Sequence, residues 1–170
     1  FSSLLPSNVA GDCSDCRVVV VKAGSMGPLL KLLKKNGPVE MIVSVAFALC
    51  NIMRPIHPSV KFDVRKELVK LGILPLILRF LNPSQDQVIV QEMLWVLSYL
   101  TAGNDDQIHE QVLKTGAAPL LTQVLGSAKG KVSTLIPLLR NIGNLCSGQD
   151  IYTAKLLQEK NFLAYLWSLL

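Results

Sequence analysis

The sequence has 170 residues, of which half are apolar but only 6% are aromatic, and its formal net charge is +5. That length is normally one domain with room for a hydrophobic core, and the positive charge is too mild and too evenly spread to require nucleic acid as a partner. The longest apolar run, residues 41–53, is shorter than the roughly 20 residues that a membrane span needs, so no membrane partner is expected.

Residues 1–12 are the least regular part, because Pro6 and Gly11 favour a loop or the frayed end of a helix. Cys13 and Cys16 follow as a CxxC motif, but the chain has no second CxxC and no His pair to complete a zinc site. We therefore expect two ordinary reduced cysteines at a helix start and no metal site. A redox role, or a metal shared with a partner, is the alternative.

Helical patterns fill the next part of the chain. Residues 17–23 contain four consecutive valines and are predicted as a helix, although β-branched residues lower helix propensity. A short helix over 28–35 and a long helix over 39–53 follow. A connection with two prolines then precedes a helix over 60–71. Its apolar residues at helical spacing are Val60, Val64, Leu68 and Leu71.

Three helical segments occupy the middle of the chain. Residues 73–81 form a short apolar helix, and Ser84 is placed to cap a long amphipathic helix over 85–102. Residues 103–105 end that helix and start another, which carries Ile108, Val112 and Leu113.

The same succession continues to the last residue. A short helix runs from Gly116 through Leu125, a long helix covers 132–146, and further helices cover 151–160 and 162–170. Pro137 lies inside the long helix, where proline is expected to kink the helix or to mark its true start.

One unit recurs along the whole chain. Gly24, Gly72, Gly116 and Asn161 lie 48, 44 and 45 residues apart, and each opens a similar apolar phrase. Self-similarity at roughly 40 to 47 residues, with two or three helices per unit, is the signature of HEAT and armadillo solenoids. The sequence therefore predicts an all-α fold, a right-handed armadillo-type α-solenoid of about three and a half three-helix repeats.

These anchors also divide the chain. We expect one domain over 1–170, with 1–23 ending a preceding repeat, 24–71, 72–115 and 116–160 as repeats, and 161–170 starting a further one. A solenoid needs polar capping repeats for solubility, and the last segment is apolar and includes Trp167. We therefore expect the chain to be a fragment of a longer solenoid, or to be capped by another chain or by missing repeats.

Three phrases in the long helices, at residues 46–52, 94–105 and 136–150, resemble armadillo repeats of the importin-α (karyopherin-α) type. In that family the long helix of a repeat carries a Trp and, four residues later, an Asn. Because four residues make about one helical turn, both side chains face the concave groove. The resemblance implies that the Trp rings form slots for side-chain stems of an extended peptide and that the Asn amides hold its backbone.

This sequence keeps that pattern in part. The resemblance assigns groove positions to Phe47 with Asn51, to Trp95 with Tyr99, and to Arg140 with Asn144. These pairs are flanked one turn earlier by Val43, Gln91 and Ile136. The predicted peptide-binding groove comprises Phe47, Asn51, Gln91, Trp95, Tyr99, Arg140 and Asn144.

Packing in the core is the alternative for Phe47 and Trp95, because an aromatic residue on an apolar helix is usually buried. Arg140 is expected in a buried or groove position, where its charge needs an acidic partner. Glu92 and Glu110 are interpreted as exposed helix residues.

No motif of the chain indicates catalysis, a cofactor or a small-molecule substrate, so we predict that it is not an enzyme. The main hypothesis is a protein–protein interaction scaffold that binds an extended peptide or protein segment. A nuclear import adaptor that reads basic nuclear localisation signals is the first alternative, and a structural subunit of a larger assembly is the second. Four cysteines without a disulfide framework favour the cytoplasm or the nucleus.

Overall fold

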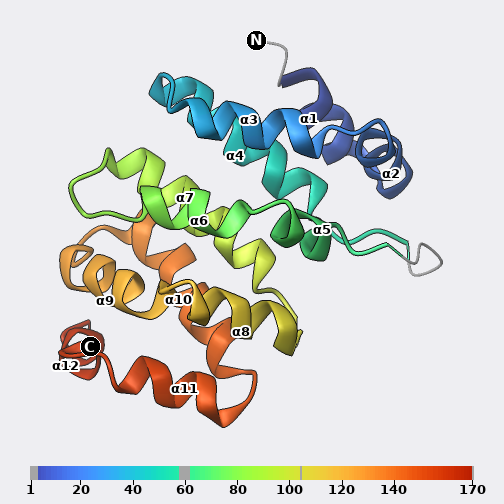
Figure 1. Cartoon of the computed structure of the whole chain (residues 1–170). Coiled ribbons are helices and arrows are strands. Elements are labelled where there is room, and N and C mark those ends of the chain that lie inside the picture. Colours follow the sequence, from blue (N-terminus) through green and yellow to red (C-terminus); the bar gives the residue numbers. More distant parts are fainter. Residues whose placement is uncertain (1–3, 58–61, 104, 170) are drawn as a thin grey trace. The chain divides into compact units, whose positions relative to one another are not determined.

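A computed structural model describes residues 4–57, 62–103 and 105–169, and over these residues the chain forms twelve α-helices and no strand (Figure 1). The chain separates into two compact units, residues 1–76 and 77–170, with the boundary inside one helix. Among the described residues, no helix has the length and apolar character needed to cross a membrane.

The first unit contains five whole helices and the start of a sixth. They are α1 (Leu4–Asp12), α2 (Ser14–Lys22), α3 (Met26–Lys35), α4 (Val39–Ile52), α5 (Val64–Lys70) and α6 (Ile73–Phe80). The long helix α4 is central, because α1, α2 and α3 all pack against it. Its buried residues include Ile42, Val45 and Leu49, which recur at helical spacing.

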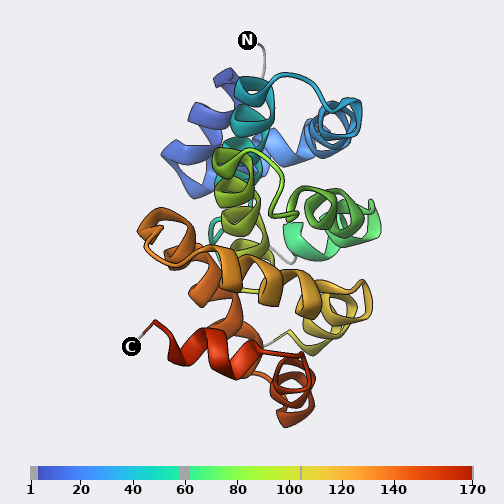
Figure 2. The same cartoon turned by 90° about the vertical axis from the view of Figure 1, so that its left-hand side faces the viewer.

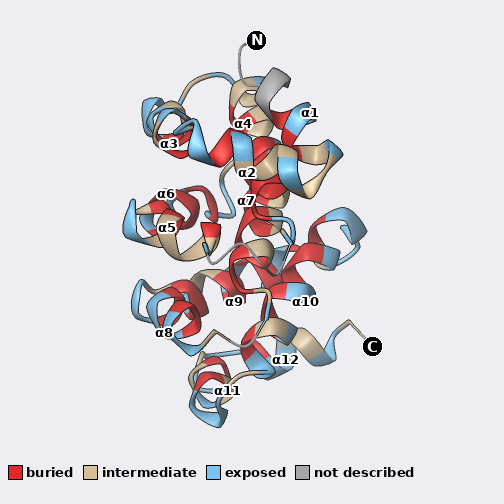
Figure 3. Ribbon diagram, turned by 90° about the vertical axis from the view of Figure 1, so that its right-hand side faces the viewer, coloured by how far each residue is buried: buried red, intermediate tan, exposed pale blue. Residues whose placement is uncertain are grey.

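The second unit holds the rest of α6 and six further helices. They are α7 (Gln87–Leu100), α8 (Asp106–Lys114), α9 (Ala117–Ser127), α10 (Val132–Cys146), α11 (Asp150–Leu157) and α12 (Phe162–Trp167). The two long helices α7 and α10 lie side by side (Figure 2). Eight of the 14 residues of α7 are buried. Red marks buried residues of this helix in Figure 3.

The helix order agrees with the repeat pattern. Two short helices and a long one recur as α2–α3–α4, α5–α6–α7 and α8–α9–α10, with α1 before them and α11 and α12 after them. Left-handed backbone at Gly24, Gly72 and Gly116 separates the first two helices of each set, and left-handed backbone at Asn161 separates α11 from α12 in the same way. Glycine enters that region without strain, which explains three of the four anchors. The right-handed winding of the solenoid remains a prediction.

The structure differs from the sequence predictions at the first helix and at the start of α5. Residues 4–12 form the helix α1 rather than a loop or a frayed end, because they gain burial against α4, as at Ala10. The predicted helix over 60–71 begins at Val64, since the Asp63 carboxylate caps it by accepting the Arg65 N–H at 2.9 Å. Val60 lies outside the described residues.

The cap of α7 also differs from the prediction. Ser84 donates its N–H and its hydroxyl to Asn82 Oδ1, so it belongs to the preceding turn. Asp86 is the cap, because its carboxylate accepts the Val88 N–H at 2.8 Å. In α10 the helix begins at Val132 and includes Pro137, so the proline does not mark the true start.

The prediction that Cys13 and Cys16 are two reduced cysteines is wrong for this structure. A disulfide joins them, while Cys50 and Cys146 take no part in a disulfide. Cys13 is the N-cap of α2, and the tight turn of that cap brings a side chain three residues ahead back to it. The helix start therefore holds the two sulfur atoms together.

Candidate functional site

The exposed part of α7 is a narrow stripe. Gln91, Trp95 and Tyr99 are partly exposed and follow one another at one-turn intervals, while Leu94 and Ser98 beside them are buried. Trp95 is thus not a fully buried core residue. Together with Arg140 and Asn144 of α10, these three residues form what we call the α7–α10 surface.

Arg140 connects the two helices across this surface. Its guanidinium carbon lies 5.9 Å from the centroid of the Trp95 ring, within the range of a cation–π interaction. Arg140 is exposed, so the expectation of a buried position is wrong, while its position in a groove remains a prediction. Among the described residues, no carboxylate forms an ion pair with it. The surface therefore presents a positive charge beside an aromatic ring.

Asn144 and Asn141 fasten α10 to α7. Asn144 Nδ2 donates to Ser98 O and to Thr101 Oγ1, both at 3.1 Å. Asn141 is fully buried, and its Nδ2 donates to Leu94 O at 2.8 Å. Asn144 is half-exposed, and its Oδ1 has no hydrogen-bond partner among the described residues. Asn144 thus holds α10 against α7 and leaves its Oδ1 as a hydrogen-bond acceptor for a ligand or solvent. Asn141 is buried between the two helices and offers no group to a ligand.

The first unit repeats this arrangement on α1 and α4. Asn51 Nδ2 donates to Ser7 O at 3.1 Å, as Asn144 Nδ2 does to Ser98 O. Asn51 is only 7% exposed, so little of its amide reaches solvent. Phe47, one turn earlier on α4, is 48% exposed and is therefore not a core residue. The peptide-binding roles of Phe47 and Asn51 remain predictions.

Sequence reasoning missed Asn8. The shared hydrogen bond aligns Ser7 of α1 with Ser98 of α7, so Asn8 occupies the position that Tyr99 occupies in the second unit. Asn8 is exposed. The irregular composition of residues 1–12 gave no signal for this position, and only the hydrogen bond between Asn51 and Ser7 shows the equivalence.

Glu92 lies next to Gln91 on the partly exposed side of α7. The carboxylate is half-buried rather than fully exposed as expected, and burial raises its pKa, an effect that the hydrogen bond from Gln91 Nε2 opposes. Glu110, by contrast, is exposed and pairs with Lys114 at 2.8 Å, which lowers its pKa. One carboxylate beside the α7 stripe, that of Glu92, therefore has no ion pair among the described residues.

Relative to the wild type, the Glu92→Gln variant should be more stable at neutral pH than at acid pH. Because the folded-state pKa of Glu92 is raised, the folded chain keeps this proton while the unfolded chain loses it, so stability falls as pH rises through the raised pKa. A neutral Gln removes that loss. We expect the melting temperature of the variant, minus that of the wild type, to increase from pH 4 to pH 7. The exposed carboxylate of Glu40 provides the control, because a similar trend for Glu40→Gln would contradict the assignment.

A family model describes part of the chain. The Armadillo/beta-catenin-like repeat matches residues 62–102, which cover α5, α6 and α7. Residues 62–102 are therefore an armadillo repeat. Among curated proteins, it is 34% identical to importin subunit alpha-1b of Oryza sativa subsp. japonica over 86% of this chain and 26% of that protein. It is 30% identical to importin subunit alpha-2 of Caenorhabditis elegans over 85% of this chain and 26% of that protein.

Solved structures support the armadillo fold. A designed armadillo repeat protein in complex with the peptide (KR)4 matches 90% of this chain and 60% of its own, with a TM-score of 0.77 and 22% identity. Computationally designed armadillo repeat proteins for modular peptide recognition match 96% of this chain and 64% of theirs, with a TM-score of 0.81 and 20% identity. At these identities the likeness shows the fold alone.

The armadillo repeat chain spans about a quarter of the length of the importin relatives that it matches. Armadillo repeat proteins and importin subunits alpha are non-enzymatic scaffolds or adaptors, which agrees with the prediction that the chain is not an enzyme. The all-α armadillo prediction and the resemblance to importin-α are both confirmed by these comparisons.

Proposed function

We propose that the chain is a protein-interaction scaffold that binds an extended peptide segment on the α7–α10 surface. The observation that carries this proposal is the partly exposed Trp95 ring with the exposed Arg140 over it. The partly exposed Tyr99 lies one turn further along α7, and the half-exposed Asn144 bonds to the neighbouring Ser98 O. Aromatic rings and arginine are the residue types that contribute most binding energy at interfaces. The importin relatives and the peptide-bound designed protein support the same class of function.

An extended peptide is the ligand that best matches these groups. Its backbone N–H and C=O groups are unpaired and need partners from the protein. Asn144 Oδ1 is an acceptor on the surface, and Gln91 is a second amide on the same face. Trp95 and Tyr99 offer apolar ring faces to side chains of the peptide. Arg140 forms no ion pair with any described carboxylate, so it favours a carboxylate at the adjoining ligand position.

The second candidate is an adaptor that reads basic nuclear localisation signals. The half-buried Glu92 favours it, because this carboxylate has no ion pair within the described parts of the chain and a Lys or Arg side chain of the ligand would supply one. The names of the importin relatives and the (KR)4 peptide of the designed protein point in the same direction. Under this reading the chain would act between the cytoplasm and the nucleus.

Fluorescence anisotropy with three peptides of equal length, one acidic, one neutral and one basic, tests both candidates. We expect the acidic peptide to bind, and Arg140→Glu to weaken it about three- to tenfold by charge reversal. Lys129→Glu is the control: it makes the same change in net charge at an exposed residue outside this surface, and it should leave the peptide affinity unchanged. Tightest binding of the basic peptide, weakened by Glu92→Gln, would favour the adaptor instead. If no peptide binds, the scaffold proposal is wrong.

A further inference from the structure

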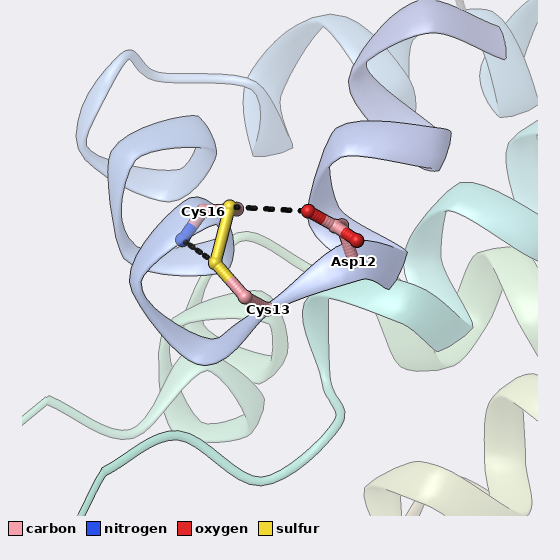
Figure 4. A group of neighbouring side chains, drawn as sticks. All are labelled: Asp12, Cys13 and Cys16. Carbon is pink, nitrogen blue, oxygen red and sulfur yellow. Dashed lines mark hydrogen bonds between the residues drawn. A yellow bond between two sulfur atoms is a disulfide. The ribbon is translucent and has the colours of Figure 1, made fainter.

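A cluster of three potential ligands lies at the junction of α1 and α2, in the first unit. Asp12 is the last residue of α1, Cys13 is the N-cap of α2, and Cys16 lies in the first turn of α2. One carboxylate oxygen and the two sulfur atoms all lie within 4.8 Å of one another. Figure 4 shows the Asp12 carboxylate turned toward the Cys16 sulfur, with Oδ2 at 4.0 Å.

The cluster is open to small molecules and ions. Asp12 is exposed, and both cysteines are half-buried, so a solvent-borne reductant reaches the disulfide. The other two cysteines take no part, because Cys50 is buried in α4 and Cys146 lies in α10. Neither the repeat architecture nor the α7–α10 surface uses this cluster.

The helix start favours negative sulfur at this position. Cys13 Sγ accepts the Cys16 N–H at 3.1 Å, and the N-terminus of a helix stabilises negative charge. After reduction, the same backbone holds two thiol groups three residues apart beside a carboxylate. Zinc takes Cys thiolates and carboxylates in tetrahedral sites, and three protein ligands leave a fourth position for water.

We propose that Asp12, Cys13 and Cys16 form a redox-controlled site for a thiophilic divalent cation of the zinc type. In the oxidised state the disulfide occupies both sulfur atoms, and no cation binds. A dithiol reductant transfers two electrons and two protons, which breaks the S–S bond, yields two Cys thiols and leaves the reductant as its own disulfide. The cation then displaces one proton from each thiol, binds both thiolates and the Asp12 carboxylate, and joins the end of α1 to the start of α2.

Zinc titration of the full chain in its two redox states tests this site. Thiol counting should find two free thiols before reduction and four after it, since the chain has four cysteines. Competition with a chromogenic zinc chelator should show one zinc ion bound by the dithiol form, none bound by the disulfide form, and two protons released per zinc ion. Zinc should also raise the melting temperature of the dithiol form, because a ligand that binds only the folded state stabilises it.

Three variants separate this site from other thiols. Cys13→Ser should abolish stoichiometric zinc binding while keeping the helix capped, because Ser is a good N-cap residue. Asp12→Asn should weaken zinc about tenfold or more, in line with the usual cost of disturbing a metal site. Cys146→Ser is the matched control and should bind zinc as the wild type does. Four free thiols before reduction, no binding by the dithiol form, equal binding by the disulfide form, or unchanged affinity in Cys13→Ser would overturn the proposal.

Discussion

Trp95→Ala should weaken binding of the preferred peptide by about 2 kcal/mol, or roughly 30-fold in Kd, which is the usual cost of removing an aromatic anchor. The substitution removes the ring from the middle of the α7 stripe and also removes the partner of the Arg140 guanidinium. Helical content should change little, because Leu94, Val96 and Leu97 still bury the opposite side of α7. The measurements are peptide affinity and thermal unfolding for the same variant.

The chain provides a matched control for this substitution. Trp167 of α12 lies in the same unit and is 76% exposed, so Trp167→Ala also removes an indole ring but leaves the α7–α10 surface intact. It should keep wild-type affinity. If Trp95→Ala unfolds the chain and the remaining folded molecules bind normally, Trp95 serves only packing, and the peptide-binding role of this surface must be abandoned.

Asn141→Ala should lower the free energy of unfolding by about 2 to 3 kcal/mol, because it removes a buried side chain that satisfies several polar groups. Its Nδ2 donates at 2.8 Å to Leu94 O and to Pro137 O, and its Oδ1 lies 3.4 Å from Thr101 Oγ1. Alanine leaves a small cavity and removes a bond between α10 and α7. For a chain of this length, the loss corresponds to a melting temperature lower by roughly 4 to 12 °C.

Urea and thermal unfolding of Asn141→Ala, compared with Gln123→Ala, measure that effect. Gln123 is an exposed amide on α9, so its truncation should change the free energy of unfolding by less than about 0.5 kcal/mol. The assignment of Asn141 as the residue that holds α10 on α7 fails if the two variants lose equal stability. A loss of peptide affinity in Asn141→Ala, beyond the fraction unfolded, would show that it also positions Arg140 and Asn144.

The sequence predicted the helices where the local pattern is regular. Apolar spacing located α4, α7 and α10 to within a few residues, because a helix that buries one face must repeat its apolar residues every three or four positions. The predicted helix starts were wrong where a capping side chain, rather than the apolar spacing, sets the first residue of the helix. Asp63 and Asp86 set the starts of α5 and α7 through cap hydrogen bonds, and neither cap follows from hydrophobic periodicity.

The roles of neighbouring polar residues were harder to predict. Asn141 and Asn144 are three residues apart on one helix, and the family resemblance pointed only to Asn144. Whether an amide is buried between helices or turned to solvent depends on the partner helix, and a single helix does not carry that information. Asn8 was not predicted because its position depends on a contact with another helix. Only the hydrogen bond between Asn51 and Ser7 shows that α1 and α7 have equivalent positions.

The sequence by itself determined the repeat architecture of this protein, because the spacing of Gly24, Gly72, Gly116 and Asn161 and the apolar period of each helix are local, additive signals. Only the tertiary structure decided which polar side chains bond between helices, that Arg140 lies over Trp95, and that Cys13 and Cys16 meet beside Asp12. Those contacts are fixed by the packing of whole helices and by the turns between them, which place residues together without any pattern in the intervening sequence.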